Sequence, residues 1–194
     1  MCGRYYVHDD LSREIEKLVR NLDPDRIVRG EIFPDQRASV IVREKSENEL
    51  EQMEWGFRLP ERKQLLINAR AETAERKRTF AGSLRSRRCL VPASWFYEWD
   101  AGRSKVAFKP GADSQPGLFL GGIWEYMQEE KRFVILTVPA DEAVRPVHDR
   151  MPLILPQGSW EDWLGAGDQY VPLLTSRPGT SLASEGYYQE TLPF

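Results

Sequence analysis

The second residue of the chain, Cys2, offers chemistry that no internal residue can supply. Because an initiator methionine is commonly removed when a small residue follows it, we expect loss of Met1 to leave Cys2 at the amino terminus. An N-terminal cysteine carries an α-amine of pKa about 7.7–8.0 close to a thiol of pKa about 8.5. The amine forms a Schiff base with an aldehyde, and the thiol then closes a thiazolidine ring. The alternative is that Cys2 packs as a small, buried apolar residue.

Two further residues could move protons. Glu98 lies in the aromatic segment 95–99 (WFYEW), where strand alternation places it on the face of Phe96. Burial there would raise its pKa and suit acid–base catalysis near neutral pH; the alternative is an edge-strand glutamate that points to water. His148 lies in segment 146–152 (PVHDRMP), where an extended chain would put Arg150 on the same face. A proton-handling group beside a phosphate-binding guanidinium suits a nucleotide substrate, whereas the alternative is a purely structural histidine.

A polar segment, residues 68–73 (NARAET), follows the apolar residues 65–67. If the strand continues, Asn68 and Arg70 point in the same direction and could both face a ligand. The alternative is a turn at the end of the strand, with Glu72 and Thr73 opening a helix.

The elements that must position these residues are mainly short strands. An apolar stripe predicts a helix over residues 9–22, capped by Asp10 or Ser12 and ended by the segment 21–24 (NLDP). Shorter helices are expected at 79–84 and at 159–164, the latter with Ser159 as its cap. Composition predicts strands at 39–42, 64–67, 89–91, 95–99, 106–108, 118–120, 133–138 and 153–155. We therefore expect an α+β fold: one domain spanning residues 1–194, with an antiparallel, barrel-like β core and a few peripheral helices.

Composition excludes several classes of protein. With 41% apolar residues, 29% charged residues and a net charge of -3, the chain can bury a core and is not intrinsically disordered. It has no apolar run of about 18 residues, as a membrane span needs, and no apolar leader, so we expect a cytoplasmic protein. Two cysteines and two histidines, none at metal-ligand spacing, predict no metal site, and no cofactor is expected.

Charge is unevenly distributed along the chain. The acidic run 44–54 is interpreted as a solvated face. The basic clusters 76–78 and 85–88 leave a nucleic-acid surface open, because mild overall acidity does not describe one groove.

Five segments, in this order, closely resemble the SOS response-associated peptidase (SRAP domain) family, over residues 2 to about 152. Each segment is short, but five in register make the resemblance specific. They are residues 1–5 (MCGRY), 55–56 (WG), 68–73 (NARAET), 88–93 (RCLVPA) leading into 96–99 (FYEW), and 148–152 (HDRMP).

This resemblance implies a protein that covalently shields abasic sites in single-stranded DNA and that is nucleoid-associated when bound. Cys2, freed of Met1, would attack the ring-opened sugar aldehyde and end in a thiazolidine crosslink. Glu98 would serve as acid and base in ring opening and the Schiff-base steps. Asn68 would position the Cys2 amine, and His148 would assist ring opening and proton transfer. Three arginines would hold the phosphates around the lesion: Arg4, Arg70 and Arg150.

Three departures from the family pattern affect DNA contacts rather than chemistry. Residues 30–34 (GEIFP) replace a Tyr-Asn that precedes Ala-Pro. Where Gly56 leads into residues 57–61 (FRLPE), the aromatic that the family usually has soon after Trp-Gly is missing beyond Phe57. Trp95 replaces a glycine. We expect Trp95 to pack in the core, the alternative being that it narrows the entrance.

Two other functions compete with this one. Cys2, His148 and Glu98 could act as nucleophile, base and orienting group of a thiol hydrolase or peptidase, which could also remove Met1 from its own chain. Alternatively, the same residues could line a noncovalent nucleic-acid groove. Oligomeric state and reversal of the crosslink are not predicted by the sequence.

Overall fold

The computed structural model describes residues 2–60, 63–112, 114, 116–176, 178 and 180–187. Most of the elements are strands, and the helices are short. The helices are α1 (Ser12–Glu16), α2 (Ala71–Ala74), α3 (Arg78–Ser86) and α4 (Trp160–Leu164), with 3-10 turns at Asp9–Leu11, Pro24–Arg26 and Val171–Thr175. The strands are β1 (Tyr5–Val7), β2 (Gly30–Ile32), β3 (Arg37–Glu44), β4 (Glu47–Trp55), β5 (Asn68–Arg70), β6 (Arg88–Ala93), β7 (Trp95–Trp99), β8 (Lys105–Pro110), β9 (Leu118–Met127), β10 (Glu130–Pro139), β11 (Arg150–Pro152) and β12 (Leu182–Tyr187).

Five of the strands close into a barrel in the order β10-β4-β3-β6-β9, because β10 pairs with both β4 and β9. Strands β5 and β11 add to β10 outside this ring. All pairings are antiparallel except those of β10 with β4 and with β5. The predicted α+β fold with an antiparallel, barrel-like core and few helices is confirmed, with these two parallel pairings as the difference.

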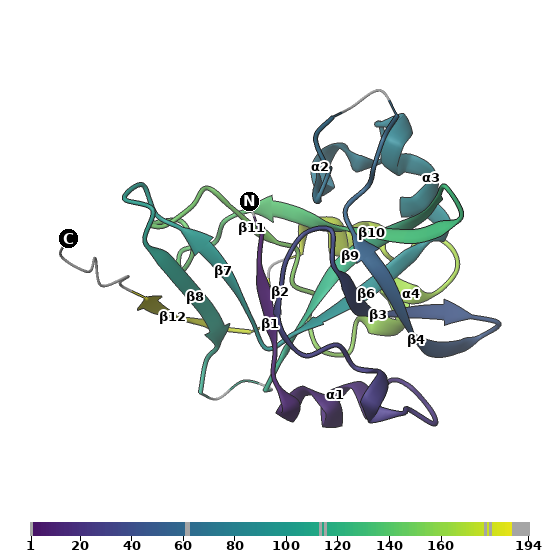
Figure 1. Cartoon of the computed structure of the whole chain (residues 1–194), viewed down its shortest axis with the longest axis horizontal. Coiled ribbons are helices and arrows are strands. Elements are labelled where there is room, and N and C mark those ends of the chain that lie inside the picture. Colours follow the sequence, from purple (N-terminus) through teal and green to yellow (C-terminus); the bar gives the residue numbers. More distant parts are fainter. Residues whose placement is uncertain are drawn as a thin grey trace.

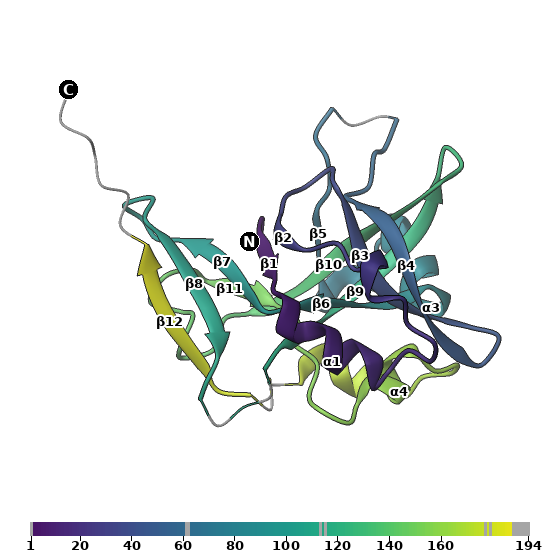
Figure 2. The same ribbon diagram turned by 60° about the horizontal axis from the view of Figure 1, so that its bottom comes forward.

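A second sheet, in the order β12-β8-β7-β1-β2, stands beside the barrel (Figures 1 and 2). The chain passes from β6 of the barrel to β7 of the sheet through Ser94 alone. The amide of Ser94 donates to the Tyr6 carbonyl (2.7 Å), and its Oγ accepts from the His8 amide (2.8 Å). This bonding ties β1 to the junction of the two sheets.

The barrel wall needs glycine where β9 faces β6 and β10. A Cβ built on Gly122 would lie 2.8 Å from Cys89 Sγ and 3.2 Å from the Val134 carbonyl. Strand β6 is buried along its whole length, as are residues 132–138 of β10. Burial of both faces is typical of strands with one face inside a barrel and the other covered.

The first helix is shorter than predicted. It begins with a 3-10 turn at Asp9–Leu11 and ends at Glu16, rather than running to residue 22. The ring of His8 caps its start in place of Asp10 or Ser12: His8 Nδ1 accepts from the Asp10 amide at 3.4 Å. Residues after Glu16 form turns, and their apolar side chains still pack on the core. The apolar stripe is therefore buried although the helix does not continue.

The other helix predictions hold in outline. The expected helices at 79–84 and 159–164 correspond to α3 and α4. Ser159 occupies the cap position of α4, but its Oγ donates to the Pro156 carbonyl (2.7 Å) instead of capping the helix. No helix among the described residues has the length and apolar character needed to cross a membrane.

Two strand predictions were wrong in the residues that form the strand. Segment 64–67 makes only an isolated bridge, between Leu66 and Phe57, and the strand begins at Asn68, where pairing with β10 starts. Segment 153–155 likewise makes one bridge, between Ile154 and Leu120, while β11 lies at Arg150–Pro152. The other six predicted strands fall within β3, β6, β7, β8, β9 and β10.

The acidic run 44–54 proves to be mostly strand β4. Its apolar residues Leu50 and Met53 are buried, whereas Glu47 and Glu49 are exposed. The predicted solvated face is therefore confirmed, but it belongs to a strand of the barrel wall.

Candidate active site

The site begins where the amino-terminal segment meets β5. The Asn68 side-chain amide donates to the backbone carbonyl of Cys2 at 2.8 Å. Asn68 Oδ1 is buried and has no hydrogen-bond partner among the described residues. One end of this side chain therefore holds Cys2, while the other keeps an acceptor available beside it.

Glu98 reaches the same place from β7. The amide of Tyr97 donates to the Arg4 carbonyl (3.0 Å), so the antiparallel pairing of β1 with β7 continues toward the amino terminus. That register brings Cys2 level with the end of β7, and the charge of Glu98 acts on the Cys2 thiol. The predicted edge-strand alternative for Glu98 is wrong, because β7 lies between β1 and β8 and Glu98 is 2% exposed.

Burial sets the protonation state of both groups. Glu98 shares its face with fully buried Phe96, and desolvation raises the pKa of its carboxyl above the ordinary range, although the charge of His148 partly opposes this shift. Burial, and then the charge of Glu98, raise the pKa of the Cys2 thiol far above its usual value. The thiol is therefore protonated at neutral pH, next to a carboxyl whose pKa is raised by burial.

His148 lies in the loop before β11. Its Nδ1 lies 2.9 Å from the Arg150 amide, 3.1 Å from the Arg150 carbonyl and 3.1 Å from Asp149 Oδ1. Residues 146–149 turn rather than forming the extended chain that we expected, and only Arg150–Pro152 is extended, as β11. His148 nevertheless lies near Glu98, since its charge lowers the pKa of that carboxyl.

The three predicted phosphate-binding arginines are in different situations. Arg4 is partly buried, 4.2 Å from the Phe33 ring centre. Arg70 is exposed at the end of β5. Arg150 makes a bidentate pair with Glu72 (2.6 and 3.0 Å), and this pair lowers the pKa of the glutamate. Sequence reasoning treated Glu72 as the start of a helix; it does lie in α2, and its partner comes from 78 residues farther along the chain.

Of the basic clusters, the second is partly structural. Arg88 is buried, and its guanidinium donates to the backbone carbonyls of Leu84 and Trp163. It also lies 4.2 Å from the ring centre of Tyr170. Arg87 pairs with Glu125. The side chains of residues 76–78 and of Arg85 are exposed and could still meet nucleic acid.

Trp95 does not pack in the core. It stacks on Tyr6 with ring centres 4.3 Å apart and planes 2° from parallel, and it is partly exposed. It lies on the face of β7 opposite Glu98, because the two residues differ by an odd number of positions. The predicted packing of Trp95 in the core is therefore wrong, and its position on the opposite face of β7 disfavours the alternative that it narrows the entrance.

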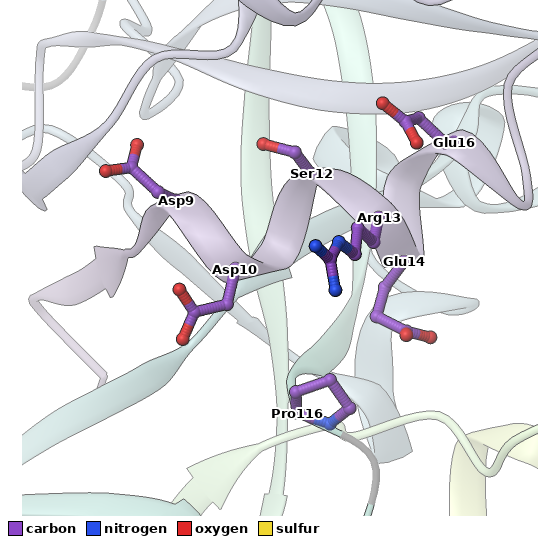
Figure 3. Close-up of a pocket in the computed structure, with 7 residues that line it drawn as sticks. All are labelled: Asp9, Asp10, Ser12, Arg13, Glu14, Glu16 and Pro116. Atoms are coloured by element: carbon purple, nitrogen blue, oxygen red, sulfur yellow. The ribbon is translucent and has the colours of Figure 1, made fainter.

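One surface hollow lies away from these residues. It measures about 700 Å³ and runs along α1 (Figure 3). Its lining includes four carboxylates, which repel an anionic ligand, and none of the predicted site residues. The residues that line it are Asp9, Asp10, Ser12, Arg13, Glu14, Glu16 and Pro116. Within the described ranges, no group of three or more His, Cys, Asp or Glu side chains is arranged to hold a metal ion.

A barrel with an appended sheet, holding Cys2, Asn68, Glu98 and His148 near one another, agrees with the comparison with protein families. Residues 1–184 match the family described as SOS response associated peptidase (SRAP), and the chain belongs to this family. The family predicted from the five sequence segments is thus confirmed.

Named relatives and solved structures extend this result. The chain is 29% identical over 183 residues to the abasic site processing protein YoaM of Bacillus subtilis, covering 84% of this chain and 79% of that protein. It is 30% identical over 178 residues to the abasic site processing protein YedK of Escherichia coli, with the same coverage of each chain. A crystal structure of a Bordetella bronchiseptica protein matches with a TM-score of 0.81 and 26% identity, over 97% of this chain and all of that one.

Proposed function

We propose that this protein processes abasic sites in DNA by capturing them covalently through Cys2, after removal of Met1. The relatives named for abasic site processing support the substrate. The observation that carries the chemistry is the 2.8 Å hydrogen bond from Asn68 to the Cys2 carbonyl, beside Glu98. It fixes the position of the residue that becomes the terminal aminothiol.

The reaction would proceed in three balanced steps. The Cys2 amine adds to the aldehyde carbon of the ring-opened sugar to give a carbinolamine. Loss of one water, with Glu98 as proton donor, gives the Schiff base. The Cys2 thiol then adds to the imine carbon and its proton passes to the imine nitrogen, which closes the thiazolidine ring. The net change is one water lost for each crosslink.

Each neighbouring residue has a role in this scheme. Glu98, whose pKa is raised by burial, donates and accepts protons in these steps. The Oδ1 of Asn68, which has no hydrogen-bond partner within the described part of the chain, can accept a hydrogen bond from the Cys2 amine and orient its lone pair. His148 assists opening of the sugar ring and the accompanying proton transfer. Arg4, Arg70 and Arg150 hold the phosphates on either side, and the open chain of single-stranded DNA lets the lesion reach the site.

The competing thiol hydrolase needs a thiolate nucleophile. Burial and the Glu98 charge favour the neutral thiol of Cys2, which disfavours that mechanism. In the thiazolidine route the amine attacks first, so the thiol does not need to ionise beforehand.

The test uses Met1-free protein and a single-stranded oligonucleotide with one abasic site. We expect a species that survives denaturation, with an intact mass equal to protein plus DNA minus one water. The Cys2→Ala variant should form no such species, whereas Cys89→Ala, which removes the other buried thiol, should form it normally. An oligonucleotide carrying a tetrahydrofuran analogue of the site, which has no aldehyde, should form no species that survives denaturation.

Three outcomes would overturn the proposal. One is the absence of any adduct from Met1-free protein, and another is an adduct with the tetrahydrofuran analogue. The third is an acyl group trapped on Cys2 from an ester or amide substrate, which would favour the hydrolase. A duplex with the same lesion tests strand preference, and we expect slower capture from it.

A further inference from the structure

A carboxylate bridges two cations next to the site. Glu31 of β2 accepts from Arg4 Nη1 at 3.3 Å and from the ammonium group of Lys105 on β8. The three side chains are 30%, 28% and 24% exposed, respectively, so water and ions can reach them. Glu31 lies in the segment 30–34, where this chain departs from the pattern of its family.

Both cations rest on aromatic rings. The Arg4 guanidinium lies 4.2 Å from the ring centre of Phe33 and 5.2 Å from that of Trp99. The Lys105 ammonium lies 3.9 Å above Tyr97. Contact with the aromatic faces adds to the attraction that positions both cations, and aromatic side chains beside them offer stacking surfaces for bases.

The cluster adjoins the reacting groups through the backbone. Arg4 is two residues from Cys2, and Trp99 directly follows Glu98. Arg4 Nε is buried and makes no hydrogen bond among the described residues, so the guanidinium keeps donor capacity beyond its single bond to Glu31. A DNA strand whose lesion reaches Cys2 would bring a neighbouring phosphate to this cluster.

We propose that Arg4 and Lys105 form a phosphate subsite for the strand next to the lesion, and that Glu31 occupies this subsite as a built-in competitor. The inference rests on the proposed function. The Glu31 carboxylate stands where a phosphate oxygen would be bound, so DNA must displace it. This competition lowers affinity for undamaged strands, while a lesion fixed by a covalent bond is unaffected once captured.

The decisive variant is Glu31→Gln, measured for binding to undamaged single-stranded DNA over a range of salt concentrations. We expect affinity to rise about two- to fivefold at low salt, the range that one exposed ion pair represents. The salt dependence should steepen by about 0.7 in log–log slope for one phosphate gained. Lys105→Gln should act in the opposite direction, and the double variant should lose most of the gain.

Glu161→Gln is the matched control, because it removes the same charge from a glutamate paired with Arg43 on the barrel. The inference is overturned if Glu31→Gln binds no tighter than this control, or if the gain persists without Lys105. If Glu31→Gln does not fold, the Lys105→Gln variant alone tests the inference. A Lys105→Gln variant with the same affinity and salt slope as wild type would then overturn it.

Failure of the proposed function is scored separately. The same preparations are mixed with abasic single-stranded DNA and examined on a denaturing gel. Wild-type protein that forms no crosslink contradicts the proposed function, whereas a crosslinking wild type with unresponsive Glu31→Gln contradicts only the phosphate subsite.

Discussion

Replacing Glu98 by glutamine should separate the chemistry of the site from the stability of the fold. The substitution keeps the shape and hydrogen-bonding capacity of a side chain that is 2% exposed but removes its ionisation. General acid–base catalysis contributes about 10²- to 10⁴-fold, so we expect crosslinking to abasic single-stranded DNA to slow by that factor. The pH–rate profile of the wild type should show an ionisation above the ordinary range of a carboxyl group, and the profile of the variant should lack it.

The same substitution should raise stability. Desolvation raises the pKa of Glu98 in the folded protein, so the folded state binds this proton more tightly than the unfolded state. Its contribution is fully present below the pKa of the unfolded chain and is lost as pH rises through the raised value. Each unit of upward shift corresponds to about 1.4 kcal/mol lost above that value. Glutamine stays neutral and avoids the loss.

Two measurements check this prediction. Single-turnover crosslinking is followed on denaturing gels between pH 5 and pH 9, and urea unfolding is measured at the two ends of that range. We expect Glu98→Gln to be slower at every pH, yet more resistant to urea at the alkaline end. A variant that crosslinks within threefold of wild type, or that is less stable at alkaline pH, would refute the role given to the Glu98 carboxyl.

Three other changes have distinct expected outcomes. Asn68→Ala removes the 2.8 Å bond to the Cys2 carbonyl, so crosslinking should slow about three- to tenfold with unchanged affinity for single-stranded DNA; an unaffected rate in the gel assay would contradict the positioning role. Glu72→Gln breaks the bidentate pair with Arg150, whose depression of the Glu72 pKa stabilises the fold above the usual carboxyl range. Because Glu72 is 37% exposed, the variant should lose less than about 1 kcal/mol of unfolding free energy at pH 7. This difference from wild type should vanish as pH falls through the lowered pKa. Gly122→Ala inserts a Cβ 2.8 Å from a cysteine sulfur in the barrel wall, which should lower the free energy of unfolding by about 1–3 kcal/mol in urea titrations; unchanged stability would mean that the wall yields freely.

The strand that carries Glu98 could be predicted because its sequence leaves little choice. Four aromatic residues of high strand propensity surround Glu98 in segment 95–99, and this segment matches β7 at both bounds. Alternation then placed Glu98 and Phe96 on one face, and the burial of both agrees with that placement. Local sequence thus determined which way the carboxyl points, but not that β1 would lie beside it.

Register and partners could not be predicted in the same way. The apolar segment 64–67 has strand composition, yet the ladder with β10 begins at Asn68, because register depends on a partner distant in the sequence. The bond from Arg150 to Glu72 spans 78 residues and leaves no local pattern. The helix expected to reach residue 22 ends at Glu16, since its later apolar residues pack equally well from a turn.

The two halves of the site come from different sheets, and Trp55 connects them. Its fully buried ring lies 5.2 Å from that of Tyr5, three residues after Cys2, and its Nε1 donates to the Ile67 carbonyl at 3.0 Å, directly before Asn68. The 2.8 Å bond between Asn68 and Cys2 therefore depends on how the open sheet packs against the barrel. A relative shift of about 1 Å would break that bond and can cost about 100-fold in rate without altering a reacting group. Burial of Tyr5 and Trp55 thus positions Cys2 for reaction near the end of the chain.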